Sequence, residues 1–503
     1  MIFSFVFYSF KPPIGDLNNN MSASISFAQI VGRILIKRIA LIFSISLGGN
    51  EMKTKEPTVE SGVFDEKVPF STLIPLGFQH LMTMVGSFMV PVIVGTAIGV
   101  DAKTLAYFVS AVMLTSGLAI LIQVIGIGKG IGSRLPFVLG SSFITLGPMI
   151  IIGKQYGLPV LFGSIIGSGI IIILLSFFLD KILLLFPKVV TGTFITIMGI
   201  TLAPVAFKDF AGGEGEPGFG SPKNMVIGLI VLAIVLLLHK FGKGFVKTMS
   251  LLIGVIVGTI IAGVSGMIDF SPVADAHWGQ VVTPFHFGMP VFNVSAIIMM
   301  TIFSIINLIQ CLGAYSVLEE AFGTKTSNKT IVRGLRGQAV AQVVSGSFNS
   351  VPHAFLNENI GVAALSGVKS RYVQITTGCI LIVLSLLPKF AAIITIIPAS
   401  VRGGAMLAIF GMVISAGISI LSQVNMSENH NNLLVGTSMA VGIGSNFVTE
   451  AFEKLPQMAE MLLSNGLFSA AVVAVLLNLV FNFDTLKKKD KDPKLAAEEN
   501  PAH

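Results

Sequence analysis

The hexapeptide Pro187-Lys-Val-Val-Thr-Gly192 has the pattern P-x-x-V-x-G, and this pattern returns 211 residues later as Pro398-Ala-Ser-Val-Arg-Gly403. A second pair of prolines, Pro136 and Pro352, lies 216 residues apart. Each of them opens a short apolar segment that is interrupted by Gly, Ser or Asn. Two features that recur at nearly the same offset predict a chain built from two related halves. A six-residue pattern also arises by chance, so the agreement between the offsets carries the prediction.

The composition predicts an integral membrane protein. Of 503 residues, 53% are hydrophobic and 11% are charged, whereas soluble domains are about 25% charged. Apolar runs recur from Phe70 to Phe483, and we count fourteen, each close to the ~20 residues that a membrane helix needs. Seven spans per half is an odd number, so the second half must be inverted in the membrane. We therefore predict an all-α membrane protein of fourteen spans, arranged as two inverted seven-span repeats with broken third and tenth spans.

The predicted spans begin near the following residues: Ser71, Lys103, Pro136, Leu158, Pro187, Asn224, Thr248, Val294, Arg333, Val351, Arg371, Arg402, Asn432 and Glu460. The expected divisions are an N-terminal extension over 1–64, a first repeat over 65–268, a second repeat over 269–485 and a charged tail over 486–503.

The codons of Gly48-Gly-Asn-Glu-Met52 allow a ribosome-binding site. We therefore interpret Met52 as the translation start and residues 1–51 as untranslated.

The net charge of +7 is explained by topology, because Lys and Arg cluster in alternate connections between apolar spans. This pattern predicts a cytoplasmic-membrane protein with both termini in the cytoplasm, and it argues against a nucleic-acid partner.

The two cysteines, Cys311 and Cys379, lie in apolar stretches and offer no disulfide framework. No HExxH, GxSxG or His-Asp cluster appears, so we expect no enzyme, no metal site and no cofactor.

Polar residues within apolar spans are candidates for function, because an embedded charge costs several kcal/mol. Glu358 is the one carboxylate that we place in the membrane core, and amides surround it in the sequence. These amides are Gln310, Gln338, Gln342, Asn349, Asn357 and Asn359. Carboxamides and a carboxylate match the donors and acceptors at the edge of a planar heterocycle. The alternative is that the amides only hold helices together.

The other broken segment contains Ser142 and Phe143, which offer close backbone approach and a ring for stacking. Core packing is the alternative for Phe143. In the first span, Gln79-His80 places an imidazole that either orients a neighbouring amide or bridges helices.

These residues resemble the motifs of the nucleobase–ascorbate transporter family, the uracil, xanthine and uric acid permeases, from about Gly77 to Phe483. The matching segments are Gly77-Phe-Gln-His80, Gly140-Ser-Ser-Phe143, Val190-Thr-Gly-Thr193, Leu202-Ala-Pro-Val-Ala206, Ala211 to Gly220 and Gly346 to Pro352. The last match is Glu358-Asn-Ile-Gly361 to Gly367, which is similar to the family signature [QEP]-N-x-G-x(4)-T-[RKG] with Ser366 in place of threonine.

The resemblance implies a core domain of spans 1–4 and 8–11 that moves against a gate domain of spans 5–7 and 12–14, in a homodimer. It also implies that the substrate lies between the third and tenth spans and is held by the eighth and tenth. The substrate-binding residues would be Gln310, Glu358, Phe143, Ser142, Asn359, Gln79 and His80. The implied function is import of a purine base, xanthine or uric acid, by proton symport and elevator-type alternating access.

This sequence departs from the family at the eighth and ninth spans. Purine members have E-x-x-G-D where this chain has Gln310-Cys-Leu-Gly-Ala314, and an aspartate where it has Gln338. Acid and amide are therefore exchanged between the eighth and tenth spans, and we expect proton coupling to rest on Glu358. The alternatives are an uncoupled or sodium-coupled carrier of uracil, guanine or hypoxanthine, and an anion carrier of the related seven-plus-seven fold. A carboxylate at the site argues against the anion carrier.

Overall fold

The computed structural model describes residues 64–178 and 186–482. The prediction of an untranslated 1–51 and the charged tail lie outside these residues. In the first half the elements are α3 (Phe70–Met84), η1 (Val85–Phe88), α4 (Met89–Ile98), α5 (Ala102–Ile125), β1 (Leu139–Ser141), α6 (Leu146–Tyr156), α7 (Leu158–Leu175), η2 (Ser176–Phe178), α9 (Lys188–Phe210), α10 (Pro222–Phe241), α11 (Phe245–Thr248) and α12 (Ser250–Val264).

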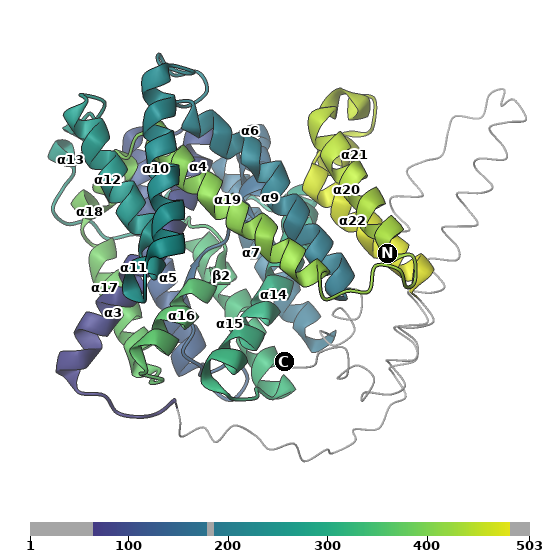
Figure 1. The fold of residues 1–503 in the computed structure, drawn as a ribbon, viewed down its shortest axis with the longest axis horizontal. Helices are drawn as coiled ribbons and strands as arrows, with labels where there is room; N and C mark the ends of the chain where they lie inside the picture. Colours follow the sequence, from purple (N-terminus) through teal and green to yellow (C-terminus); the bar gives the residue numbers. More distant parts are fainter. Residues whose placement is uncertain (1–63, 179–185, 483–503) are drawn as a thin grey trace, which may run out of the picture.

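The short α13 (Ser271–Asp275) lies in the connection to the second half. That half contains α14 (Val294–Phe322), α15 (Asn328–Ser347), β2 (His353–Phe355), α16 (Asn357–Ser366), α17 (Tyr372–Ser385), α18 (Pro388–Thr395), α19 (Ala399–Leu421), α20 (Asn431–Phe447), η3 (Thr449–Phe452), α21 (Gln457–Leu463) and α22 (Gly466–Phe481). Helices or strands therefore follow the predicted starts of the spans, and the described part of the chain is all-α apart from two three-residue strands (Figure 1).

The spans are not uniform in length, and breaks occur beyond the predicted third and tenth spans. Within the described residues, seven helices are long and apolar enough to cross a membrane, and α12 and α22 are shorter apolar helices. Glycine and proline account for several interruptions, because they weaken or end helices. The eleventh span bends by 89° between α17 and α18, and Pro388 begins α18. The third and tenth spans are broken as predicted, each into a strand followed by a half-length helix.

The helices pack in two sets. The strand-bearing set comprises α3–α7 and α14–α18 with β1 and β2, and its tightest pairings include α5 with α17 and α7 with α15. The α9–α19 set comprises α9, α10, α12 and α19–α22, and its main pairing is α9 against α19. The helices α9 and α19 carry the repeated P-x-x-V-x-G pattern at their starts, so equivalent elements of the two halves pack on one another.

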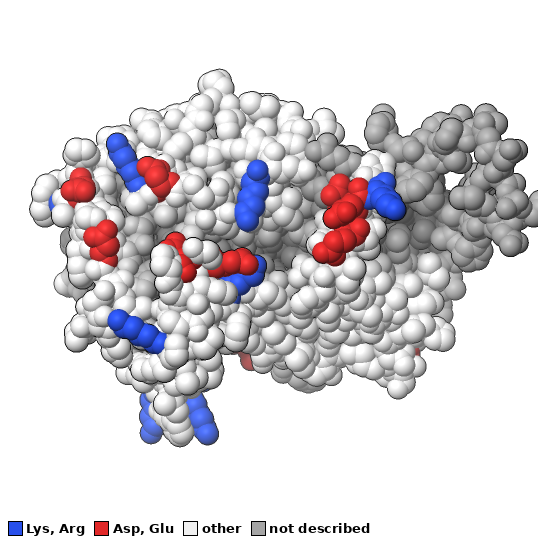
Figure 2. Space-filling view, turned by 90° about the horizontal axis from the view of Figure 1, so that it is seen from above, with Lys and Arg blue, Asp and Glu red and all other residues white. Residues whose placement is uncertain are grey.

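Glycine allows the close contact between α9 and α19. A Cβ added to Gly417 would lie 2.3 Å from Oγ1 and 2.5 Å from the backbone N of Thr196. At one end of this pair the Arg402 guanidinium donates to Asp209, with 3.1 Å between Nε and Oδ2. On the face seen from above, Lys, Arg, Asp and Glu side chains form small groups on an otherwise uncharged surface (Figure 2).

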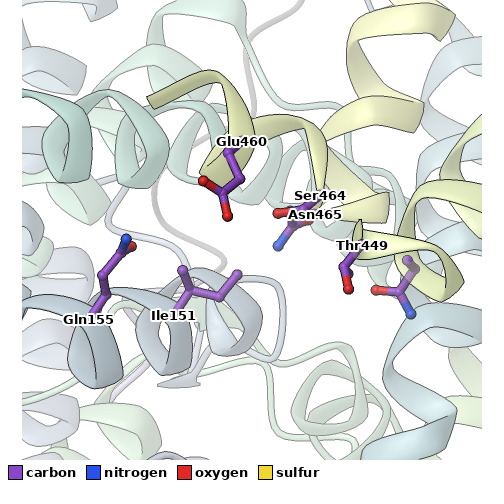
Figure 3. A pocket seen from close by; sticks show the side chains of 7 residues that line it. Ile151, Gln155, Thr449, Glu460, Ser464 and Asn465 are labelled. Carbon is purple, nitrogen blue, oxygen red and sulfur yellow. The ribbon is translucent and has the colours of Figure 1, made fainter. Parts of the chain in front are cut away.

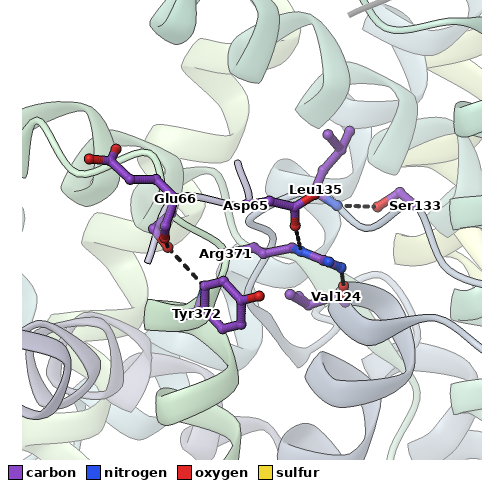
Figure 4. Close-up of polar contacts among 8 residues, drawn as sticks. Asp65, Glu66, Val124, Ser133, Leu135, Arg371 and Tyr372 are labelled. Carbon is purple, nitrogen blue, oxygen red and sulfur yellow. Dashed lines mark hydrogen bonds and ion pairs between the residues drawn. The ribbon is translucent and has the colours of Figure 1, made fainter. Parts of the chain in front are cut away.

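The segment before α3 is tied to the strand-bearing set (Figure 4). Arg371 Nε donates to Asp65 Oδ1 at 2.5 Å, and Arg371 Nη1 donates to the Val124 carbonyl at 2.7 Å. Ser370 Oγ donates to the Glu66 carbonyl at 2.5 Å. One arginine therefore joins the entry to the first span, the end of α5 and the start of α17.

Candidate functional site

The two broken spans cross at their strands. β1 and β2 pair antiparallel with Leu139 opposite Phe355 and Ser141 opposite His353, and all six strand residues are buried. The backbone pairing continues beyond the strands, because Ser142 N donates to the Pro352 carbonyl at 2.9 Å. Each strand leads into a half-length helix, α6 after β1 and α16 after β2, so two helix N-termini begin near the crossing.

Gly140 is required at this crossing by its close neighbours. A Cβ at Gly140 would lie 2.6 Å from Ser87 Oγ and 2.8 Å from Leu356 Cδ1. The glycine of the Gly140-Ser-Ser-Phe143 segment therefore lets β1 approach both η1 and the start of α16.

Ser142 belongs to a buried network that fixes the crossing to α14. Its hydroxyl donates to Asn307 Oδ1 at 2.9 Å, and Asn307 Nδ2 donates to the His353 carbonyl at 2.8 Å. Gln338 Nε2 donates to the same carbonyl at 3.0 Å. Ser142 is buried and already paired, so it positions the site and offers little surface to a ligand.

His80 and Asn359 lie together, so the imidazole both contacts an amide and joins two helices, which were the two alternatives for it. His80 Nδ1 is 2.8 Å from Asn359 Oδ1, and Gln374 Nε2 is 3.4 Å from His80 Nε2. A neutral imidazole satisfies both contacts by donating from Nδ1 and accepting at Nε2. All three side chains are buried, so the QH segment of α3 holds α16 and α17 in register. The side chain of Gln79 is half-buried.

Phe143, Gln310 and Glu358 keep surface that a ligand can reach. Phe143 is half-buried, and its ring meets the edge of Phe410 on α19 at 5.9 Å between centroids and 89° between planes. Gln310 is half-buried on α14, one helical turn after Asn307. Phe143 follows Ser142 in the chain, and Gln310 lies one helical turn after Asn307. The hydrogen bond between Ser142 and Asn307 therefore links the two segments that carry Phe143 and Gln310.

Glu358 keeps accessible surface after β2, so a ligand can reach it. Its side chain is exposed, whereas the neighbouring Asn359 and Ile360 are buried. The cause is the helical period: one face of α16 packs on α3 and α14, and Glu358 lies on the opposite face with Leu365. Glu358 forms no ion pair with any other described residue.

Two of the predicted amides have different roles. Gln342 Nε2 lies 2.7 Å from Ser168 Oγ and 2.8 Å from Ser304 Oγ, which supports the interpretation that it holds helices together. Gln338 has one bonded nitrogen, and its buried Oε1 has no partner among the described residues. Sequence reasoning did not select Gln374, although an amide within an apolar span is the same signal that selected Gln338.

The comparisons with known proteins identify the family. A family model described as the permease family matches residues 71–451. The xanthine permease of Bacillus subtilis (strain 168) is 41% identical over 85% of this chain and 98% of its own length. The chain belongs to this permease family.

Other permease relatives have similar coverage. The nucleobase transporter PlUacP of Paenibacillus larvae is 38% identical over 86% of this chain and 98% of its own length. The uric acid transporter UacT of Escherichia coli (strain K12) is 37% identical over 84% of this chain and 90% of its own length. Members of this family are permeases, so the chain is a multi-pass membrane protein and not an enzyme.

Solved structures of the same architecture confirm the fold. The transmembrane domain of the cyanobacterial bicarbonate transporter BicA superposes with a TM-score of 0.52 at 17% identity, over 83% of this chain and 99% of that chain. The murine anion transporter Slc26a9, in its inward-facing state, gives a TM-score of 0.56 at 13% identity, over 88% and 75%. The permease therefore has the seven-plus-seven inverted-repeat fold, and this likeness concerns the fold alone.

Proposed function

We propose that this permease imports a purine base, xanthine or uric acid, across the cytoplasmic membrane. The observation that carries the proposal is that relatives at 37–41% identity are named for xanthine, uric acid or nucleobases. It is supported by three residues that keep accessible surface on the segments around the crossing: Phe143, Gln310 and Glu358. The ring of Phe143 stacks on the flat base. The Gln310 amide supplies one donor and one acceptor, and the Glu358 carboxylate accepts from the N–H groups of the base.

The buried residues near the site prepare it for binding. Ser142 and Asn307 fix Phe143 relative to Gln310, and His80 holds Asn359, the neighbour of Glu358. Positions held by buried hydrogen bonds lose little freedom when the base binds, which favours affinity.

Transport follows by proton symport. A protonated Glu358 carries no net charge while the bound base crosses the membrane, and its exposed position lets it exchange a proton with water. The strand-bearing set corresponds to the core domain and the α9–α19 set to the gate domain. In our proposal the core domain moves against the gate domain in a homodimer with both termini in the cytoplasm, where the connections carry most cations.

Replacement of Glu358 tests the coupling. In proteoliposomes with an imposed pH gradient, Glu358→Gln is expected to abolish accumulation of radiolabelled xanthine, while exchange of internal for external xanthine continues. Glu320→Gln is the matched control, because Glu320 is an exposed acid near the end of α14. Accumulation by Glu358→Gln at the wild-type level and with the same pH dependence would refute the coupling role. Accumulation driven by a sodium gradient instead would favour the sodium-coupled alternative.

A further inference from the structure

A polar cavity that does not include Glu358 lies between α6 of the strand-bearing set and the α20–α22 region of the α9–α19 set. Its volume is about 340 Å³, within the range of about 300–1,000 Å³ that is usual for small-molecule sites. Ile151 contributes an aliphatic wall on α6. The polar lining consists of Gln155, Asn446, Thr449, Glu460, Ser464 and Asn465.

The polar groups of this cavity are available to a ligand. Glu460 from α21 and Gln155 with Ile151 from α6 point toward one another across the open space (Figure 3). Neither Glu460 nor Gln155 forms a side-chain hydrogen bond or ion pair with another described residue. Asn465 Oδ1 accepts from Phe468 N at 3.0 Å and so begins α22, which leaves its Nδ2 group to face the cavity.

The cavity also leads toward the proposed substrate site. Asn465 Nδ2 lies 3.7 Å from the point that a Cβ on Gly147 would occupy. Gly147 is the second residue of α6, four residues after Phe143, whereas Gln155 is near the other end of that helix. Eight helical residues cover about 12 Å. The lining therefore extends along α6 from its outer end to the turn that follows Phe143.

The chemistry of the lining fits a neutral, planar heterocycle. One carboxylate accepts from ring N–H groups, and the amides of Gln155, Asn446 and Asn465 match adjacent carbonyl and N–H groups. A metal ion would need several charged oxygen ligands, whereas Glu460 is the single acid among the described residues of the lining.

We propose that this cavity is an outer binding site, which receives the purine base before the base reaches Phe143. This inference rests on the proposed function and its sidedness, and it adds a second recognition step. Because both helix sets supply walls, relative motion of the sets changes the cavity and passes the base inward.

Initial rates of xanthine uptake test the role of Glu460. Glu460→Gln is expected to raise the KM for xanthine about tenfold with little change in kcat, because a charge-assisted hydrogen bond becomes a neutral one. Glu453→Gln makes the same change on an exposed acid of the same connection that does not line the cavity, and it is expected to keep the wild-type KM. The amount of folded protein in the membrane is measured for each variant. A wild-type KM for Glu460→Gln would overturn the proposal.

Substrate protection of a cysteine tests binding directly. Ile151→Cys, made together with Cys379→Ala, places a thiol in the wall of the cavity, while Cys311 remains buried. A membrane-impermeant maleimide added to intact cells is expected to label this thiol, and xanthine is expected to slow the labelling. Protection should persist when Gln310 and Glu358 are both replaced by Ala, because the outer site does not use them.

Three outcomes would overturn the outer site: no labelling from outside, labelling at the same rate with xanthine, or protection that disappears in the Gln310→Ala/Glu358→Ala background. The last outcome would mean that xanthine acts only through the central site. Failure of the proposed function is a separate result, because the wild-type permease would then take up neither xanthine nor uric acid.

Discussion

Replacing Phe143 by Ala is expected to weaken binding of xanthine by about 5- to 150-fold. The range follows from the ~1–3 kcal/mol that stacking of an aromatic ring on a base contributes, with each 1.4 kcal/mol equal to a factor of ten. The structure supports this use of the ring, because Phe143 is half-buried and meets Phe410 only through an edge-to-face contact, which leaves part of the ring open.

The same substitution also affects folding, so the two effects must be measured apart. The edge-to-face pair contributes about 0.5–1.5 kcal/mol, and its loss lowers the melting temperature without altering affinity. Phe143→Leu and Phe410→Leu form a matched pair, because both remove the aromatic contact and only the first removes a ring from the ligand.

The assay is equilibrium binding of radiolabelled xanthine to the purified permease, with thermal unfolding of each variant followed in parallel. We expect Phe143→Leu to lose affinity and Phe410→Leu to retain it, with the larger fall in melting temperature for Phe410→Leu, because Phe410 is fully buried. Unaltered affinity in Phe143→Ala would refute stacking and support core packing. Equal losses of affinity in the two Leu variants would show that binding depends on the contact between Phe143 and Phe410 and not on stacking of the Phe143 ring on the base.

Three further predictions concern the site, the helix pairing and the entry segment. Gln310→Ala is expected to weaken xanthine binding about tenfold with little change in melting temperature, and unchanged affinity would remove Gln310 from the site. Gly417→Ala is expected to destabilise the α9–α19 pair by about 1–3 kcal/mol in thermal unfolding, whereas Gly411→Ala on the same helix, with no atom within 4 Å of the added Cβ, should have little effect. Asp65→Asn is expected to lower the free energy of unfolding by less than about 1 kcal/mol and to leave uptake unchanged, because the ion pair between Asp65 and Arg371 is partly exposed. A large loss of uptake would contradict this purely structural role.

Much of the fold was predictable from hydropathy and from the spacing of prolines. Pro136 and Pro352 marked the two broken spans, because proline removes a backbone donor and limits the residue before it. The orientation of adjacent residues was harder to predict. Glu358 and Asn359 follow one another in the sequence, yet one is exposed and the other is buried against His80. A hydropathy pattern does not determine which face of a ten-residue half-helix packs against its neighbours.

The outer cavity was not predictable, for a related reason. Its lining combines residues from the third span with residues from the last two, and no local pattern links Gln155 to Glu460. Glu460 entered the sequence interpretation only as the start of a span. A convergence of this kind depends on how the two halves pack, which the spacing of apolar residues does not encode.

The pairing of β1 with β2 has a consequence for the diversification of these permeases. Main-chain groups make the crossing, so its geometry does not depend on which side chains stand beside it. Phe143, Gln310 and Glu358 can therefore be exchanged for other residues while the frame that presents them persists. If these three positions hold the base as we propose, a new preference among related bases needs only a few substitutions around an unchanged scaffold, and a designer who wishes to retune the specificity should alter those positions and leave Gly140 untouched.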